Sequence, residues 1–278
     1  MATITASDVN KLRQLTGAGM MDCKNALVEA DGDTEKAIDI LRKKGQKLAL
    51  KRADRDANQG IVVAKVDAAK KFAGIIMLNC ETDFVAKNEE FVAYARKVLD
   101  LAVETKCSSL ADLLSASIDG RTIAEGVTDL TGKTGEKMEL AHYEFVEAPF
   151  VVAYNHFGNR LAAILGMNLD NVAEIDQIGK HVAMQVAAMS PVAVDKDDVS
   201  REIIDREMEI GKDQARAEGK PEEMVEKIAM GKLNKFYKES TLLNQEFIND
   251  SKMSVRDYIT KADKNLTVTK FRRLQLGA

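Results

Sequence analysis

The chain has 278 residues, which is enough for two compact domains, and its 40 basic against 44 acidic residues give a formal net charge of −4. This balance does not favour nucleic acid as the main partner, and the three unpaired cysteines fit a reducing compartment rather than a disulfide framework. The first residues lack the parts of a signal peptide and no stretch has the apolar length of a membrane span, so we expect a cytoplasmic protein without a membrane partner.

The N-terminal part of the chain predicts three short helices. Ser7 can cap the first helix, which ends at the glycine-rich segment 16–19. Helical spacing predicts the second helix over 20–30 and the third over 34–44, with Gly45 placed to end the third. A bundle of this size is near the lower limit for independent folding, so we expect a docking module. The expected inward side chains are Val9, Leu12, Leu15, Met20, Cys23, either Ala26 or Leu27, Ala30, Ala37, Ile38 and Leu41.

Four basic residues follow this bundle: Lys47, Lys51, Arg52 and Arg55. Such a run marks a charged linker and is typical of a solvated helix face. The alternative is that these residues bind RNA, which would make the chain an RNA-binding protein with a salt-sensitive affinity.

From Ile61 the pattern changes to strands. Segments 61–66 and 72–80 suit an antiparallel hairpin, and segment 136–147 predicts a further strand. Between them, apolar spacing predicts a helix over 91–104 and shorter helical pieces over 110–114 and 122–130.

The hairpin is repeated later in the chain. Val62-Val63-Ala64 recurs as Val151-Val152-Ala153, and segment 73–79 recurs as 162–168. Each copy precedes a helix, the second of which is expected over 172–188 with Ile175, Ile178, Val182, Val186 and Met189 inward. We therefore predict an α+β fold whose core consists of two similar subdomains, each a hairpin plus a helix.

The junction after strand 72–80 carries a large apolar residue, Phe84, directly after Asp83. Two interpretations stay open from the residues alone. Because binding residues often lie on loops that a rigid scaffold holds, Phe84 can be a ring offered to a partner. Alternatively, Phe84 folds back onto its own core and Asp83 only caps a turn, since aromatic side chains are commonly buried.

A helical hairpin is expected after the second subdomain helix. One long helix should run from 195 to 218, and Gly219-Lys220-Pro221 should reverse the chain into a second helix that reaches 238. A thin apolar seam with charged flanks is typical of a protruding antiparallel coiled coil. The expected seam is Val199, Ile203 and Ile210 against Val225, Ile228, Leu233 and Phe236. A short helix over 254–262 and a strand over 267–276 complete the chain.

The sequence contains no convincing active site. The segment 126–134 ends in Gly-Lys-Thr but has one residue too many for a phosphate-binding loop. His142, His156 and His181 share no metal-ligand spacing. A thiol enzyme centred on Cys80 is the remaining enzymatic alternative, although the neighbouring Asp83 should raise the pKa of that thiol. This pattern favours a protein that works by binding.

Four motifs spread over nearly the whole chain belong together: residues 12–27, Cys80-Glu81-Thr82-Asp83-Phe84-Val85-Ala86-Lys87-Asn88, Tyr154-Asn155-His156-Phe157-Gly158-Asn159-Arg160, and Gly219-Lys220-Pro221. The first two are highly specific. With these motifs the chain resembles the bacterial elongation factor Ts family, the nucleotide-exchange factors of the translational GTPase elongation factor Tu. The resemblance implies that the N-terminal bundle is a ubiquitin-associated-like domain and that the repeated hairpin is the family's two-subdomain core.

The resulting domain prediction has four parts. It assigns 1–55 to the ubiquitin-associated-like docking domain, 56–147 to the N-terminal core subdomain, 148–196 with 239–278 to the C-terminal core subdomain, and 197–238 to an antiparallel coiled coil inserted in the latter.

The resemblance also implies the functional residues. Thr82, Asp83, Phe84 and Val85 would dislodge the Mg²⁺ ion that elongation factor Tu binds with GDP, with Phe84 as the wedge. Further partner contacts would come from His156, Met20 and Met21. Gln185 stands where some relatives carry a histidine, so no role is carried over to it.

The expected protein is therefore a guanine nucleotide exchange factor for GDP-bound or nucleotide-free elongation factor Tu, and not an enzyme. It should need no catalytic residue, cofactor, metal or bound nucleotide of its own.

Overall fold

The computed structural model describes residues 4–277. Residues 1–3 and 278, at which the first and last predicted domains begin and end, lie outside this range. The helices are α1 (Ala6–Thr16), α2 (Met20–Glu29), α3 (Thr34–Lys51), α4 (Asp83–Ala86), α5 (Glu89–Glu104), α6 (Leu110–Ser115), α7 (Ile123–Thr134), α8 (Ile175–Met189), α9 (Arg201–Ala217), α10 (Glu222–Ser240) and α11 (Val255–Thr260). The strands are β1 (Gln59–Val66), β2 (Phe72–Cys80), β3 (Ser117–Ile118), β4 (Arg121–Thr122), β5 (Glu139–Glu147), β6 (Phe150–Asn155), β7 (Leu161–Met167), β8 (Glu246–Phe247), β9 (Asp250–Ser254) and β10 (Val268–Gln275). This mixture of helices and strands confirms the α+β class.

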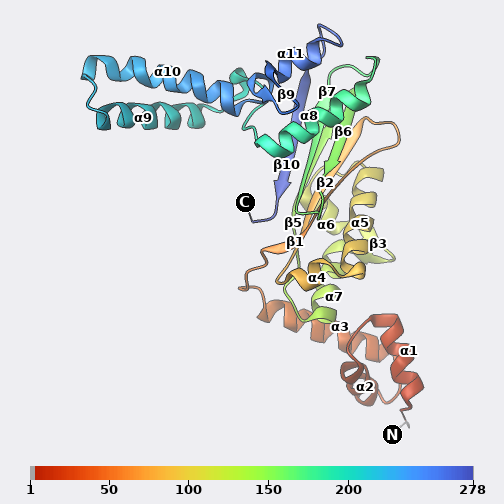
Figure 1. Ribbon diagram of the computed structural model, residues 1–278. Coiled ribbons are helices and arrows are strands. Elements are labelled where there is room, and N and C mark those ends of the chain that lie inside the picture. Colours follow the sequence, from red (N-terminus) through yellow and green to blue (C-terminus); the bar gives the residue numbers. More distant parts are fainter. Residues whose placement is uncertain (1–3, 278) are drawn as a thin grey trace.

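Helices α1 to α3 form a small bundle at one end of the molecule, shown in red in Figure 1. Thr5, and not Ser7 as predicted, caps α1, because the Thr5 side chain accepts a hydrogen bond from the backbone N–H of Asp8. Leu12, Cys23 and Leu27 fill the small core as expected. Leu15 and Met20 were expected inward, but both side chains are exposed.

Helix α3 is longer than predicted, because Gly45 does not end it. Gly45 is buried in the interior of α3, where the helix crosses α7. A Cβ atom added at Gly45 would lie 3.4 Å from the Cα of Gly132, so the absence of side chains lets the two helices approach. Lys47 and Lys51 are exposed on this longer helix, which confirms the solvated helix face expected for them, and the charged linker is limited to the residues after Lys51.

Two three-stranded antiparallel sheets form the centre of the molecule. Their strand orders are β1-β2-β5 and β10-β7-β6, so each repeated hairpin contributes two neighbouring strands to its own sheet. The last strand, β10, completes the second sheet by pairing with β7. The repeat in the sequence is thus a repeat in the structure.

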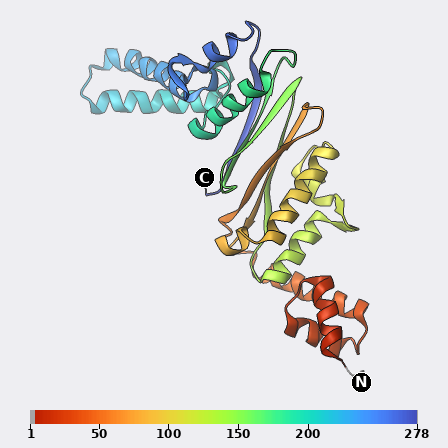
Figure 2. The same cartoon turned by 45° about the vertical axis from the view of Figure 1, so that its right-hand side comes forward.

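The two sheets pack against each other face to face. Alternate residues of the strands point into the space between them, for example Val62 and Ile75 from the first sheet and Val151 and Ile164 from the second. Helix α5 covers the outer face of the first sheet and α8 covers the outer face of the second (Figure 2). Because both faces of each sheet are buried, β2 and β7 are almost continuously apolar.

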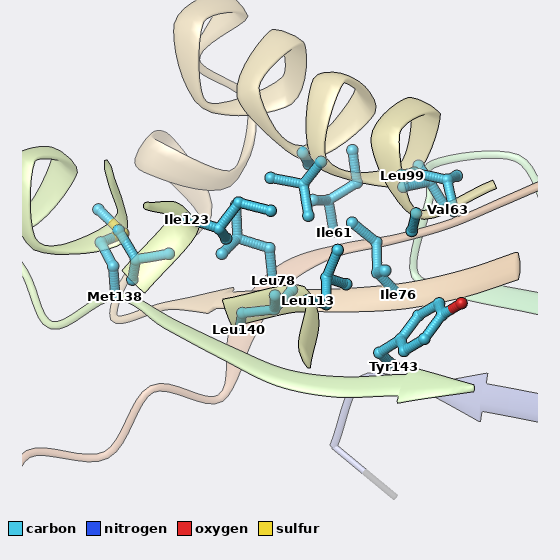
Figure 3. Packing of buried hydrophobic residues seen from close by; sticks show 14 of the residues in the cluster. Ile61, Val63, Ile76, Leu78, Leu99, Leu113, Ile123, Met138, Leu140 and Tyr143 are labelled. Carbon is cyan, nitrogen blue, oxygen red and sulfur yellow. The ribbon is translucent and has the colours of Figure 1, made fainter. Parts of the chain in front are cut away.

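The core beneath α5 joins residues from distant parts of the chain. Ile61, Ile76 and Leu78 from the sheet meet Leu99 from α5 and Ile123 from α7 (Figure 3). Phe91 from the start of α5 is also fully buried. This core ends directly below the junction that carries Phe84.

The core beneath α8 contains a buried amide group. The Gln185 side chain donates to the Oε1 of Gln245 and to the carbonyl of Glu246, and it accepts from the backbone N–H of Ile248. All its hydrogen bonds are therefore made inside its own chain. Helix α8 begins at Ile175 rather than at 172, because Glu174 adopts a left-handed conformation with φ 56°. Met189 was expected inward but is exposed at the end of the helix.

Helices α9 and α10 form an antiparallel pair that projects away from the sheets (Figure 1). The single long helix predicted from 195 is wrong, since a 3₁₀ turn over Lys196–Asp198 precedes α9 and Ser200 caps α9. The predicted seam is also wrong at Ile210, which is exposed. Small residues form the contact instead: a Cβ atom at Gly211 would lie 3.0 Å from the Cα of Ala229.

Candidate partner-binding site

The junction after β2 is a single helical turn, α4. The Thr82 side chain caps this turn by accepting from the backbone N–H of Val85 at 3.4 Å. Asn88 then caps α5 by accepting from the N–H groups of Glu90 and Phe91. Asp83 does not cap the turn, contrary to one interpretation of the sequence, since its carboxylate binds the Lys87 ammonium group at 2.7 Å.

Hydrogen bonds of two carboxylates, Glu81 and Glu136, connect the turn to other parts of the chain. Glu136 accepts from the Thr82 hydroxyl group at 2.6 Å and from the Thr82 backbone N–H at 3.0 Å. Glu81 accepts from the Nη1 of Arg52 at 2.8 and 2.9 Å and from the backbone N–H of Lys137 at 2.6 Å. The start of α4 is therefore attached both to the end of α3 and to the chain entering β5.

Phe84 points away from the protein that carries it. Its side chain is 82% exposed, whereas Val85 on the same turn is partly buried against the core beneath α5. The interpretation in which Phe84 folds back onto its own core is therefore wrong. A large exposed aromatic ring on a turn that hydrogen bonds hold in place can bind a partner with little loss of conformational entropy.

The charges at this turn are fixed by their neighbours. The Lys87 ammonium group lowers the pKa of Asp83, so this carboxylate is ionised at neutral pH. The N–H of Lys137 and then the guanidinium group of Arg52 lower the pKa of Glu81. The exposed ring thus lies beside an ionised carboxylate whose charge is paired with the Lys87 ammonium group.

Cys80 lies immediately before this turn and is fully buried. Burial, and then the carboxylate of Glu136, raise the pKa of the Cys80 thiol to about 12. Asp83 raises it as the sequence predicted, but Asp83 is a minor cause. The thiol therefore keeps its proton at neutral pH, and this contradicts its use as a nucleophile.

The turn between β6 and β7 presents two more rings. Phe157 is 96% exposed, and His156 is exposed beside it with its Nδ1 2.9 Å from the Tyr154 hydroxyl oxygen. Asn155 anchors the turn to β1, because its side chain accepts from the N–H of Ala64 at 2.7 Å and donates to the Ala64 carbonyl at 2.8 Å. This turn is therefore as firmly held as the Phe84 turn.

The two turns are attached to the same end of β1. Gln59 at the start of β1 pairs with Cys80 at the end of β2, directly before the Phe84 turn. The Gln59 side chain also accepts from the Nη1 of Arg160 at 2.7 Å, at the end of the His156 turn. One strand end thus brings together the two motifs that lie far apart in the sequence.

The remaining predicted contact residues lie on the bundle. Met20 is 51% exposed and Met21 is 64% exposed, and both belong to the first turn of α2. Leu15 and Val28 are exposed on the same bundle. An exposed group of flexible methionine and aliphatic side chains is typical of a protein-binding surface.

Sequence reasoning missed the residues that hold the site. Arg52 was assigned to a charged, solvated segment, and Glu136 was given no role. The ion pair of Arg52 with Glu81 and the hydrogen bonds of Glu136 to Thr82 join residues far apart in the chain, so they leave no local pattern. Phe157 was noted only as part of the turn. Its position directly before the Gly-Asn turn, whose Gly158 and Asn159 both have positive φ, was the available signal.

Other chemistry is not supported by the geometry. Segment 126–134 lies within α7, so it forms no phosphate-binding loop. In the part of the chain that the structure describes, no three His, Cys, Asp or Glu side chains lie close enough to hold a metal ion. Within residues 4–277, no helix combines the length and the apolar character needed to cross a membrane.

Comparison with known proteins places these features in context. The family profile described as Elongation factor TS matches residues 81–278. The elongation factor Ts of Amoebophilus asiaticus is 50% identical over 275 residues, which cover 99% of each chain. That of Christiangramia forsetii is 49% identical over 277 residues and 100% of each chain. That of Chlorobaculum tepidum is 43% identical over 288 aligned positions and 100% of each chain.

Proposed function

Because the chain belongs to the elongation factor Ts family, we propose that it is a guanine nucleotide exchange factor for the translational GTPase elongation factor Tu. It acts in the cytoplasm on the GDP-bound GTPase, loosens Mg²⁺ and promotes the release of GDP, so that GTP can bind. The observation that carries this proposal is the 82% exposed ring of Phe84 on a turn that Glu81 and Glu136 hold in place.

The proposed step is mechanical and cleaves no bond. Burying an aromatic side chain in a partner contributes about 1.5–3 kcal/mol, which can offset the displacement of the partner groups that hold the ion and the nucleotide. Thr82 and Val85 set the position of Phe84, since Thr82 caps the turn and Val85 packs below it. Asp83 stays beside the ring as an ionised group paired with Lys87.

Two further surfaces add affinity in this proposal. His156 contacts elongation factor Tu from the turn anchored to β1, and we add Phe157 because it is the more exposed of the two rings. Met20 and Met21 dock the bundle, residues 1–55, on the GTPase. Several weak contacts on one rigid chain bind more tightly than any of them alone, because the second contact forms within a complex.

The direction of the cycle follows from linkage. If a factor weakens the binding of GDP to elongation factor Tu, bound nucleotide weakens the binding of that factor to elongation factor Tu to the same extent. A newly bound GTP therefore releases the exchange factor. The chain needs no nucleotide site or cofactor of its own for this cycle.

The two alternatives receive no support from the geometry. The buried, protonated thiol of Cys80 does not favour a thiol enzyme. Arg52, one of the four residues of the basic segment, is engaged with Glu81 and its side chain is only 30% exposed, so it is not free to bind RNA.

The test is the release of labelled GDP from elongation factor Tu with excess unlabelled nucleotide. The full chain at catalytic amounts should accelerate release, and each molecule should turn over many complexes. If GDP were released at the spontaneous rate at every concentration of the chain, the proposed function would be contradicted.

A further inference from the structure

Helix α3 connects the docking bundle to the Phe84 turn. It meets the core at two places, the crossing with α7 and the contact of Arg52 with Glu81, and it is fixed at both. Its first half packs Ala37, Ile38 and Leu41 into the bundle. Its second half crosses α7, and its cap residue, Arg52, binds Glu81. The same continuous helix therefore contributes to both predicted partner contacts.

The crossing with α7 is a contact between backbones. A Cβ atom at Gly132 would lie 3.1 Å from the Cα of Gly45, and a Cβ atom at Gly45 would lie 3.7 Å from the carbonyl oxygen of Thr128. At these two positions, neither glycine places a side chain between the helices that could rotate and absorb a displacement. The separation of α3 from α7 is consequently set by the absence of side chains at both glycines.

The end of α3 is fixed by a partly buried ion pair. The Arg52 and Glu81 side chains are 30% and 16% exposed, so the pair is shielded from solvent more than an ordinary surface pair. The Lys137 ammonium group adds a hydrogen bond to the carbonyl of Ala53, just past the cap, at 2.9 Å. Glu81 in turn precedes Thr82, the residue that caps the Phe84 turn.

Outside α3, the bundle approaches the core at Gly17, where an added Cβ atom would lie 2.7 Å from the Cε of Lys133. A cleft of about 500 Å³ lies between them, lined by Leu15 and Leu41 on the bundle side and by Tyr94, Lys97 and Asp129 on the core side. Of the three bundle helices, α3 makes the most extensive contact with the core. The orientation of the bundle therefore depends chiefly on how α3 is fixed.

We infer that Gly45, Gly132 and Arg52 are positioning residues of the exchange reaction. They hold α3 as a rigid connector, so that the docking face at Met20 and Met21 and the ring of Phe84 keep one fixed separation and bind the partner together. This inference rests on the proposed function. It differs from a flexible tether, in which the bundle would only raise the local concentration of the partner.

The first test measures the connector without any partner. Nitroxide labels at Glu29→Cys on α2 and Glu104→Cys on α5 report the distance between bundle and core by pulsed electron resonance; both positions are exposed. We expect a narrow distance distribution that Gly132→Leu shifts or broadens, since the added side chain must push α3 away. A broad distribution in the otherwise unchanged chain would overturn the inference, whatever the chain does to elongation factor Tu.

The second test is a double-mutant cycle on GDP release, with Gly132→Leu and the docking-face variant Met21→Glu. Each should lower the apparent affinity for the GDP-bound GTPase by about tenfold or more, because simultaneous binding is lost. The double variant should lose little beyond either single variant, since both remove the same coupling. If the affinity losses of the two single variants multiplied in the double variant, the positioning role would be contradicted. It would also be contradicted if Gly132→Leu changed the distance between the labels but kept full affinity.

Arg52 provides a variant that leaves the helix crossing intact. Arg52→Gln should lower the apparent affinity by about tenfold, the effect of one charged hydrogen bond, and Arg52→Lys should restore part of it. Equal loss in both would indicate a general structural defect and count against the role. If no form of the chain accelerated GDP release, the proposed function would fail, while the distance measurement would still decide the rigidity of α3.

Discussion

Replacing Phe84 by Ala tests the most exposed part of the proposed site. The ring is 82% exposed in the free chain, so nearly all of its surface remains to be buried in a partner. Full burial of a phenylalanine is worth about 1.5–3 kcal/mol, and about four-fifths of it corresponds to about 1.2–2.5 kcal/mol, or a roughly 7- to 60-fold lower second-order rate of exchange. The free energy of unfolding should change by no more than about 0.5 kcal/mol, because the ring supports no core.

The assay is GDP release from elongation factor Tu at several concentrations of the variant, with urea unfolding measured in parallel. Met230→Ala is a matched control, since Met230 is 48% exposed but lies on α10 away from the turn. The control should exchange at the rate of the unchanged chain. An unchanged rate for Phe84→Ala, with normal stability, would refute the reasoning that the ring acts as a wedge.

Three further outcomes follow from the geometry. Thr82→Val should lower the free energy of unfolding by about 1–2 kcal/mol and also slow GDP release, because it removes the cap of α4 and the bond to Glu136. The control Ser109→Ala, which removes the cap of α6, should lower only the stability, and an equal slowing of GDP release by both variants would contradict the account. Replacing residues 207–233 by a short Gly-Ser turn should leave most exchange activity, since the α9–α10 pair projects away from the Phe84 turn (Figure 1) and Gly211 faces Ala229; a complete loss would show that the pair contacts the GTPase. Because the folded-state pKa of Cys80 is raised to about 12, its contribution to stability is complete below the ordinary thiol pKa and is lost as the pH rises above it. Unfolding free energies should therefore begin to fall near pH 8.5, and the fall should approach about 1.4 kcal/mol per pH unit about one unit or more above that pH. It should be less steep in Cys80→Ala, whereas equal slopes would contradict the burial of the thiol.

The regular elements and the doubled hairpin were predictable because local patterns specify them. The near-continuous apolar runs of β2 and β7 indicate strands with two buried faces, and the spacing of Phe91, Ala95 and Val98 indicates one buried helix face. The family resemblance pointed to Phe84, and the structure shows that its ring is exposed.

Features that depend on a distant contact were not predictable. A glycine that ends a helix and a glycine at a helix crossing look alike in the sequence, and only the contact with Gly132 shows that Gly45 is of the second kind. Gly211 likewise carries no local signal of its close contact with Ala229, and Ile210 beside it is exposed instead of lying in the seam. In both cases the fold uses backbone contact where the sequence pattern predicts side chains.

Long-range ion pairs gave no sequence signal either. Arg52 belongs to a basic run that is typical of a solvated linker, and only the folded chain places it against Glu81. The short strands β3, β4, β8 and β9 were missed because two to five residues carry too little periodicity.

The most direct test of the central claim is the Mg²⁺ dependence of GDP release from elongation factor Tu. If the chain acts by loosening the ion, the factor by which it accelerates GDP release should be large at millimolar Mg²⁺. This factor should shrink when a chelator is added, because the chelator has then already removed the ion that the chain would loosen. An acceleration factor that is the same with and without Mg²⁺ would contradict the account.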